Sequence, residues 1–135
     1  MINKISHIGI AVKSIEEASK FYEKIGLKIE SIEEVPSQKL RVAFIPVGES
    51  KIELLEATSE DSPIFKYIEK KGEGIQHIAF DVDDLQKTLS FCENNDIQLI
   101  DKEARPGAGG NDIAFLHPKA SFGVLYEFCK KRAKD

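Results

Sequence analysis

The sequence lacks the features that mark membrane proteins and nucleic-acid-binding proteins. No stretch approaches the roughly 20 consecutive apolar residues that a membrane-spanning helix needs. The net charge is −4 and no basic block is present, which argues against a general nucleic-acid-binding surface. We interpret the only two cysteines, Cys92 and Cys129, as small hydrophobic residues and not as a disulfide bridge. The N-terminal stretch MINKISHIGIAV already has the pattern of a strand and leaves no room for a signal peptide, so we expect a cytoplasmic protein.

The chain contains an internal repeat. Residues 5–29 (ISHIGIAVKSIEEASKFYEKIGLKI) align without a gap with residues 75–99 (IQHIAFDVDDLQKTLSFCENNDIQL). The offset is 70 throughout, and it places His7 on His77. A histidine in an apolar strand is more often a core residue, but the repeat shows that this one has an equivalent in the second half.

A second pair of segments extends the repeat toward the C-terminus. Residues 42–56 align with residues 113–128 once a few extra residues are allowed in the second hairpin. This match places Glu53 on Glu127, each within an otherwise apolar strand. The sequence therefore predicts a duplication that carries two histidines and two glutamates to equivalent positions.

Each half of the repeat predicts the element order βαβββ from its hydrophobic periodicity and its capping residues. In the first half we expect a strand at 4–12, a helix at 15–25 between Ser14 and Gly26, and strands at 27–35, 39–47 and 50–57. In the second half we expect a strand at 75–82, a helix at 84–95 capped by Asp83, and strands near 97–103, 111–118 and 122–129. A connecting helix is expected from Ser62 to Lys71, closed by Gly72.

This pattern predicts an α+β fold in which two tandem βαβββ modules form a cupped mixed sheet with helices on its outer face. A chain of 135 residues fits one domain of this kind. We place module 1 at residues 1–58, the connecting helix at 59–73 and module 2 at 74–130, within a single domain that spans residues 1–135.

The residues beside the two histidines are small. Along the first strand, His7, Gly9 and Ala11 alternate with large apolar residues, so they share one face of the sheet. The same parity puts His77 and Ala79 on one face in the second half. A packed core would fill this face with large side chains, and we therefore expect open space above the histidines.

Two histidines and two glutamates form a donor set that suits a divalent cation. An unpaired glutamate inside an apolar strand is costly, and it is improbable at two duplicated positions. A hydrogen-bonded His–Glu pair without metal remains an alternative for each half alone. For all four residues together we favour a site for Co, Ni, Zn, Mn or Fe, with room left for water or substrate. The predicted metal ligands are His7, Glu53, His77 and Glu127.

The chain resembles the vicinal oxygen chelate (glyoxalase/bleomycin resistance/dioxygenase) superfamily over essentially its whole length. The segments that carry the resemblance are KISHIGIAV, KIELLEATSEDSPIFKYIEKKGEGIQHIAFDVDDL and RPGAGGNDIAFLHPKASFGVLYEF. Within the superfamily it is most similar to the methylmalonyl-CoA epimerases, and GEGIQHIAF and GGNDIAFLHPK are the more discriminating stretches. The family places metal ligands on the first and fourth strands of each module, and the matching positions are the same four residues.

The resemblance implies a metal-dependent isomerase that transfers a proton at the carbon beside a thioester carbonyl, as in methylmalonyl-CoA epimerase. It implies Glu53 and Glu127 as opposed catalytic carboxylates, a small thioester of CoA or glutathione as substrate, and a homodimer. The alternative is lactoylglutathione lyase (glyoxalase I), which acts on the hemithioacetal of methylglyoxal and glutathione and shares the ligand pattern. A less favoured reading is a drug-sequestering binding protein, but such proteins commonly lack the ligand set.

One position departs from the epimerase pattern. Many epimerases carry a separate, non-ligand glutamate on the third strand of module 1, and the aligned residue here is Val42. This leaves Glu53 or Glu127 as the base, the arrangement associated with glyoxalase I. Against glyoxalase I, the stretch IGIAV after His7 contains no arginine that could bind glutathione.

The segment RPGAGGN (residues 105–111) contains three glycines and one proline. It lacks the Lys-Ser/Thr and the following helix of a P-loop, and its composition favours a flexible connection between strands. At the mouth of the sheet, the backbone amides of Gly109, Gly110 and Asn111 could contact the substrate.

Overall fold

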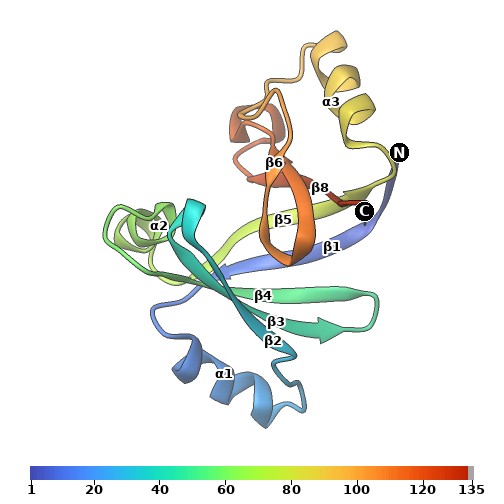
Figure 1. Cartoon of the computed structure of the whole chain (residues 1–135). Helices are drawn as coiled ribbons and strands as arrows, with labels where there is room; N and C mark the ends of the chain where they lie inside the picture. Colours follow the sequence, from blue (N-terminus) through green and yellow to red (C-terminus); the bar gives the residue numbers. More distant parts are fainter. Residues whose placement is uncertain (134–135) are drawn as a thin grey trace. The chain divides into compact units, whose positions relative to one another are not determined.

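The computed structural model describes residues 1–133 (Figure 1). The chain divides into two compact units. The N-terminal unit is His7–Gln76, and the C-terminal unit combines Met1–Ser6 with the segment that begins at His77. The helices and strands follow in the order β1 (Ile2–Ala11), α1 (Ile15–Lys24), β2 (Ser31–Val35), β3 (Leu40–Val47), β4 (Ser50–Ala57), α2 (Pro63–Lys71), β5 (Gly74–Val82), α3 (Leu85–Asn94), β6 (Arg105–Pro106), β7 (Asn111–Phe115) and β8 (Tyr126–Lys131).

The sheet of the N-terminal unit has the strand order β2-β3-β4-β1. Strands β1 and β4 are parallel, whereas β2–β3 and β3–β4 are antiparallel. Helix α1 lies against one face of this sheet (Figure 1), where Ile15 packs with Ala43, Ile45 and Leu54. These apolar residues alternate along their strands with the residues of the opposite face, which is the face of His7.

The C-terminal unit repeats this arrangement with the strand order β5-β8-β7-β6. Strands β5 and β8 are parallel, and the other pairs are antiparallel. Leu89 of α3 packs with Val82 and Phe128 on the face opposite His77. The expected α+β fold of tandem βαβββ modules with mixed strand pairing is therefore confirmed, and in each unit the helix covers the face away from the histidine.

Helix capping agrees with the sequence in two helices and differs in the third. The Ser14 hydroxyl accepts from Glu17 N–H at the start of α1, and α2 runs between Ser62 and Gly72 as expected. The residue that caps α3 is Asp84, which accepts from Lys87 N–H, so the expected cap at Asp83 was wrong. The Asp83 carboxylate instead accepts a hydrogen bond from the Asn3 side chain at 2.8 Å.

Two expected strands of the second half were misplaced. Among the described residues at 97–103 only an isolated antiparallel bridge forms, between Leu99 and Leu116, because the Asp101 carboxylate takes the N–H of Phe115 that would continue the strand pairing. The expected strand at 122–129 begins only at Tyr126. Phe122 and Gly123 have φ angles of 58° and 93°, a left-handed conformation that a strand cannot contain. The strand expected at 27–35 similarly begins late, at Ser31.

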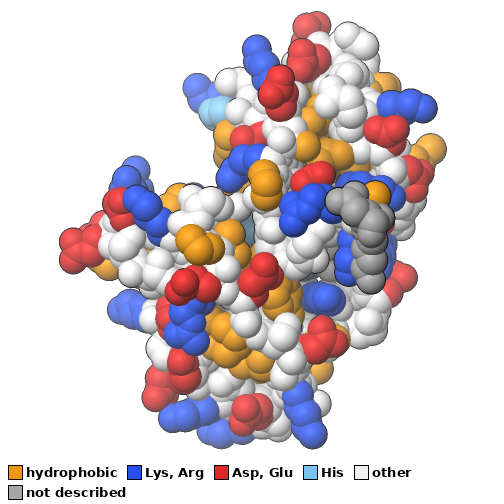
Figure 2. All heavy atoms as spheres, viewed as in Figure 1, with side chains coloured by type: hydrophobic (Ala, Val, Ile, Leu, Met, Phe, Trp, Pro, Cys, Tyr) orange, Lys and Arg blue, Asp and Glu red, His pale blue; other side chains and the backbone are white. Residues whose placement is uncertain are grey.

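No helix within residues 1–133 is long and apolar enough to cross a membrane. Figure 2 shows basic and acidic side chains interspersed over the visible face, without a broad patch of one sign. Cys92 and Cys129 are buried and form no disulfide, and burial raises the pKa of the Cys92 thiol. The assignment of residues 1–135 to one domain stays a prediction.

Candidate functional site

The N-terminal unit holds the first histidine–glutamate pair. The parallel register of β1 and β4 places Gly9 beside Glu53. Because glycine has no side chain, the Glu53 carboxylate can reach His7, two residues earlier on the same face of β1. Nδ1 of His7 lies 3.2 Å from Oε2 of Glu53, and the two residues are only 4% and 5% exposed.

The C-terminal unit holds the equivalent pair. Strands β5 and β8 are parallel, and their register places Ala79 beside Glu127. Nε2 of His77 lies 3.5 Å from Oε1 of Glu127, and the residues are 5% and 4% exposed. The duplication therefore reproduces the same buried pair from the same two strands of each module.

The two pairs fit the chemistry of a divalent cation. Each pair offers imidazole nitrogen and carboxylate oxygen atoms, the donor types that borderline divalent metals take. Burial of a carboxylate is costly unless it is compensated, and a bound divalent cation would supply such compensation at both pairs. The structure brings His7 to Glu53 and His77 to Glu127. One metal centre made by all four residues stays a prediction.

A second group of side chains supports His77. The ring of Phe115 contacts the imidazole edge to face, with 5.5 Å between ring centroids. The Asp101 carboxylate accepts hydrogen bonds from Phe115 N–H at 2.8 Å and from Arg105 Nε at 3.1 Å. The Arg105 guanidinium lies 5.5 Å from the Phe115 ring centroid. The aromatic ring that contacts His77 is thus fixed by an ion pair behind it.

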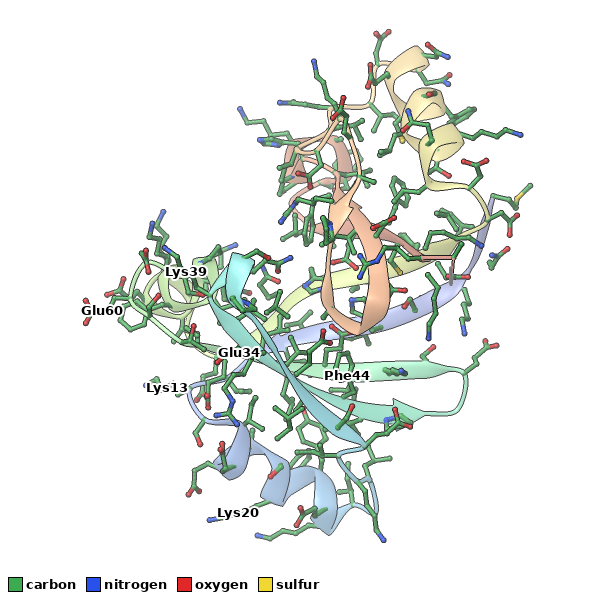
Figure 3. All side chains as sticks on the ribbon, viewed as in Figure 1. Lys13, Lys20, Glu34, Lys39, Phe44 and Glu60 are labelled. Atoms are coloured by element: carbon green, nitrogen blue, oxygen red, sulfur yellow. The ribbon has the colours of Figure 1, made fainter. Side chains whose placement is uncertain are left out.

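The N-terminal unit contains a related arrangement that the sequence interpretation missed. Phe44, labelled in Figure 3, is paired in register with Glu53, just as Phe115 is paired with Glu127. The Lys51 ammonium lies 5.5 Å from the Phe44 ring centroid. The available signal was the alignment of VAF with IAF in the internal repeat, which places the two phenylalanines on equivalent positions.

The segment RPGAGGN connects β6 to β7 as a tight turn. Ala108–Gly110 forms one turn of 3₁₀ helix, and Gly109 and Gly110 have φ angles of 69° and 75°, which favour glycine. Arg132 donates from Nη1 to the backbone oxygen of Asn111 at 3.0 Å, which ties the end of the turn to the C-terminal strand. Substrate contact by Gly109, Gly110 and Asn111 stays a prediction.

Val42 is the residue at which the resemblance to the epimerases led us to expect a non-ligand glutamate. It is 1% exposed and lies on β3, opposite Leu55 of β4 and opposite Glu33 of β2. The pairing puts Val42 on the same face as Glu53, two residues from Phe44 along β3. The site therefore has an apolar side chain at this position.

Comparison with known proteins places these features in a family. An uncharacterized protein of Bacillus subtilis, YqjC, is 44% identical over 132 residues, which are 97% of this chain and 94% of YqjC. Human mitochondrial methylmalonyl-CoA epimerase is 34% identical over 128 residues, covering 93% of this chain and 73% of the human protein.

A solved structure matches along the entire chain. A variant of Streptomyces coelicolor methylmalonyl-CoA epimerase in complex with 2-nitronate-propionyl-CoA has a TM-score of 0.94 and 33% sequence identity, covering 100% of this chain and 99% of that one. Residues 6–115 match the family described as Glyoxalase/Bleomycin resistance protein/Dioxygenase superfamily. The predicted relationship is confirmed: the chain belongs to the glyoxalase/bleomycin resistance protein/dioxygenase superfamily, and its relatives include methylmalonyl-CoA epimerases.

Proposed function

We propose that this protein is an isomerase of the methylmalonyl-CoA epimerase type, which transfers a proton at the carbon beside a thioester carbonyl. The observation that carries the proposal is the buried histidine–glutamate pair that recurs on the first and fourth strands of both modules. The relatives support the substrate class, because the Streptomyces coelicolor enzyme was solved with a CoA thioester analogue.

We assign His7, Glu53, His77 and Glu127 as the ligands of one divalent cation, with Co, Ni, Zn and Mn as candidates. The proposal is supported by the donor types, by the burial of all four residues and by their duplication. The chemistry that such an ion supplies when bound is Lewis-acid polarisation of a carbonyl oxygen, which makes the neighbouring C–H bond more acidic.

Glu53 and Glu127 are also the proposed proton-transfer groups. Inversion at a carbon requires removal of a proton from one face and delivery of a proton to the other. Two carboxylates from duplicated modules would meet this requirement. His7 and His77, which pair with the two carboxylates, would orient them. The burial of both pairs would keep water from competing for the proton.

We also propose a contact with the substrate, a homodimer and a cytoplasmic location. Backbone amides of Gly109, Gly110 and Asn111 would bind a carboxylate or thioester oxygen of the CoA substrate. The protein would act as a homodimer in the cytoplasm. The support for the homodimer is the resemblance to the epimerases.

Lactoylglutathione lyase is the second candidate function. The buried Val42 favours it, because this reaction would rely on a glutamate of the ligand set as the base. The apolar stretch after His7 disfavours it, because Gly9 and Ala11 are buried and offer no cation for glutathione.

Both candidates can be tested on one metal-loaded preparation. Epimerisation of methylmalonyl-CoA is followed with a stereospecific coupling enzyme, and thioester formation from methylglyoxal and glutathione is followed by ultraviolet absorbance. We expect epimerisation, and we expect His77→Ala to reduce it at least 100-fold, in the range of a lost metal-site residue. His117→Ala is the matched control, because His117 caps a surface turn by accepting from Lys119 N–H. Unchanged epimers with the wild-type protein would refute the proposal.

A further inference from the structure

Strand β2 carries a carboxylate on the face of the N-terminal sheet that holds His7 and Glu53. In the antiparallel pairing of β2 with β3, Glu33 lies directly opposite Val42. Val42 in turn lies opposite Leu55 on β4, two residues beyond Glu53. Paired residues project to the same face of a sheet, as do residues two apart on one strand. Glu33 therefore projects to the same side of the sheet as Glu53.

The neighbouring residue on β2 projects to the other face. Glu34, labelled in Figure 3, is opposite Arg41 on β3. The Arg41 guanidinium donates to Glu56 at 2.9 Å and to Glu16 of helix α1 at 3.2 Å. Arg41 and Glu34 thus belong to the helix-covered face. Glu33 and Glu34 are chemically identical side chains on opposite sides of one strand.

Glu33 is a carboxylate on the same face of the sheet as His7 and Glu53, but it does not belong to the proposed ligand set. On the four strands of the N-terminal unit, residues 7–57, the ionisable side chains that share this face are His7, Glu33, Lys51 and Glu53. His7 and Glu53 form the candidate ligand pair, and Lys51 lies over the Phe44 ring. Glu33 is half-buried, whereas its neighbours Ile32 and Glu34 are exposed.

We propose that Glu33 is the proton acceptor for one face of the substrate carbon, an inference that rests on the proposed epimerase function. Neighbouring strands lie about 4.8 Å apart, so Glu33 is one strand farther from the His7–Glu53 pair than residue 42. Val42 places no carboxylate on β3, and the longer Glu33 side chain would have to extend across β3 to act beside that pair. Glu33 thereby supplies from β2 a carboxylate that Val42 does not supply from β3.

The proposed reaction removes one proton from the substrate carbon and delivers another proton to its opposite face. The Glu33 carboxylate takes the proton from the carbon beside the thioester carbonyl, and the electron pair of the C–H bond moves into the enolate. Glu33 then takes the place of one of the two carboxylates proposed above, and the other, Glu53 or Glu127 in its protonated form, delivers its proton to the opposite face and restores the C–H bond. Exchange of both carboxyl groups with water returns them to their starting protonation states.

The test follows hydrogen exchange from each epimer separately. The two epimers of methylmalonyl-CoA are incubated in D₂O with metal-loaded wild-type protein, and deuterium at the reacting carbon is measured by mass spectrometry. We expect Glu33→Gln to reduce exchange from one epimer by about 100-fold or more, the usual range for a lost general base, while the other epimer continues to exchange. A purely structural defect would lower the rate of exchange from both epimers equally.

Two further variants and a binding measurement complete the test. Glu34→Gln, the matched control on the helix-covered face, should exchange both epimers at the wild-type rate. Val42→Glu in the Glu33→Gln background should restore exchange from the affected epimer, and Co²⁺ titration should give the same affinity for Glu33→Gln as for wild type. Equal loss from both epimers, or no loss, overturns the role of Glu33. A wild-type protein that exchanges neither epimer overturns the proposed function itself.

Discussion

Gly9 and Ala79 show how a single small residue positions a buried carboxylate. Each lies beside a glutamate across a parallel strand pair, Gly9 beside Glu53 and Ala79 beside Glu127. A large side chain at either position would project onto the same face and occupy the space between the carboxylate and its histidine. The small residue is therefore part of the pair, although it contributes no polar atom.

This role predicts the effect of enlarging Gly9. Gly9→Val should push the Glu53 carboxylate away from His7 and weaken divalent metal binding on the order of 10–100-fold, the range found for residues that support a metal ligand. Isothermal titration calorimetry with Co²⁺ or Zn²⁺ measures the change. The control is Ile8→Val on the other face of β1, which should bind metal as the wild type does. Equal affinities for Gly9→Val and wild type would contradict the assigned role of Gly9.

At the scale of secondary-structure elements, helix α1 is held at its N-terminus by residues near and far in the chain. The Ser14 hydroxyl accepts from Glu17 N–H, and the Glu56 carboxylate accepts from Ile15 N–H at 2.9 Å. Arg41 donates to the same Glu56 carboxylate at 2.9 Å. The local cap at Ser14 could be predicted from the sequence, whereas Glu56 could not, because strand pairing alone brings it to the helix.

The turn after β4 is attached to the turn before β3 by Asp61. Its carboxylate accepts hydrogen bonds from the Lys39 ammonium and the Ser59 hydroxyl, which together lower its pKa from 3.8 to about 2, with Lys39 the larger cause. Because the pKa is lower in the folded state, the interaction stabilises the fold above about pH 4. That contribution is lost as the pH falls from about 4 toward 2.

This pKa can be measured directly. The side-chain carboxyl carbon of Asp61 should titrate near pH 2 in an NMR pH series, and Lys39→Met should move its midpoint up toward 3.8. Acidification from pH 4 to pH 2 should lower the melting temperature of Asp61→Asn less than it lowers that of the wild type. Glu60→Gln, an exposed neighbour, serves as the control. A wild-type Asp61 that titrates near 3.8 would show that Lys39 does not hold it.

At the scale of the whole molecule, the repeat explains which features the sequence could predict. The duplicated pattern predicted the βαβββ order and carried two histidines and two glutamates to equivalent positions, because the offset is constant and strand alternation determines the face of each residue. Which glutamate lies beside which histidine came from the strand pairing of the structure, which joins His7 to Glu53 and His77 to Glu127. The second module was harder to place. Its strand near 97–103 was lost because Asp101 bonds to the backbone of Phe115, a tertiary interaction that periodicity does not reveal.

The same duplication predicts how the molecule should respond to loss of metal. If both pairs hold one cation, its binding free energy adds to the stability of the fold, by about 2.7 kcal/mol when the free metal is 100-fold above its Kd. Differential scanning calorimetry should show a melting temperature several degrees lower after chelation, at about 2–8 °C per kcal/mol for a chain near this size.

Single substitutions in the two modules then distinguish one shared site from two separate ones. His7→Ala and His77→Ala should each remove most of the metal-dependent rise in melting temperature, because each substitution takes one of the four proposed ligands from the same ion. His117→Ala should keep the full rise. If each of the two substitutions leaves about half of the rise, each module binds its own ion. If either variant keeps the full metal-dependent rise in melting temperature, its substituted histidine is not a metal ligand. The proposed chemistry would then be restricted to the other module.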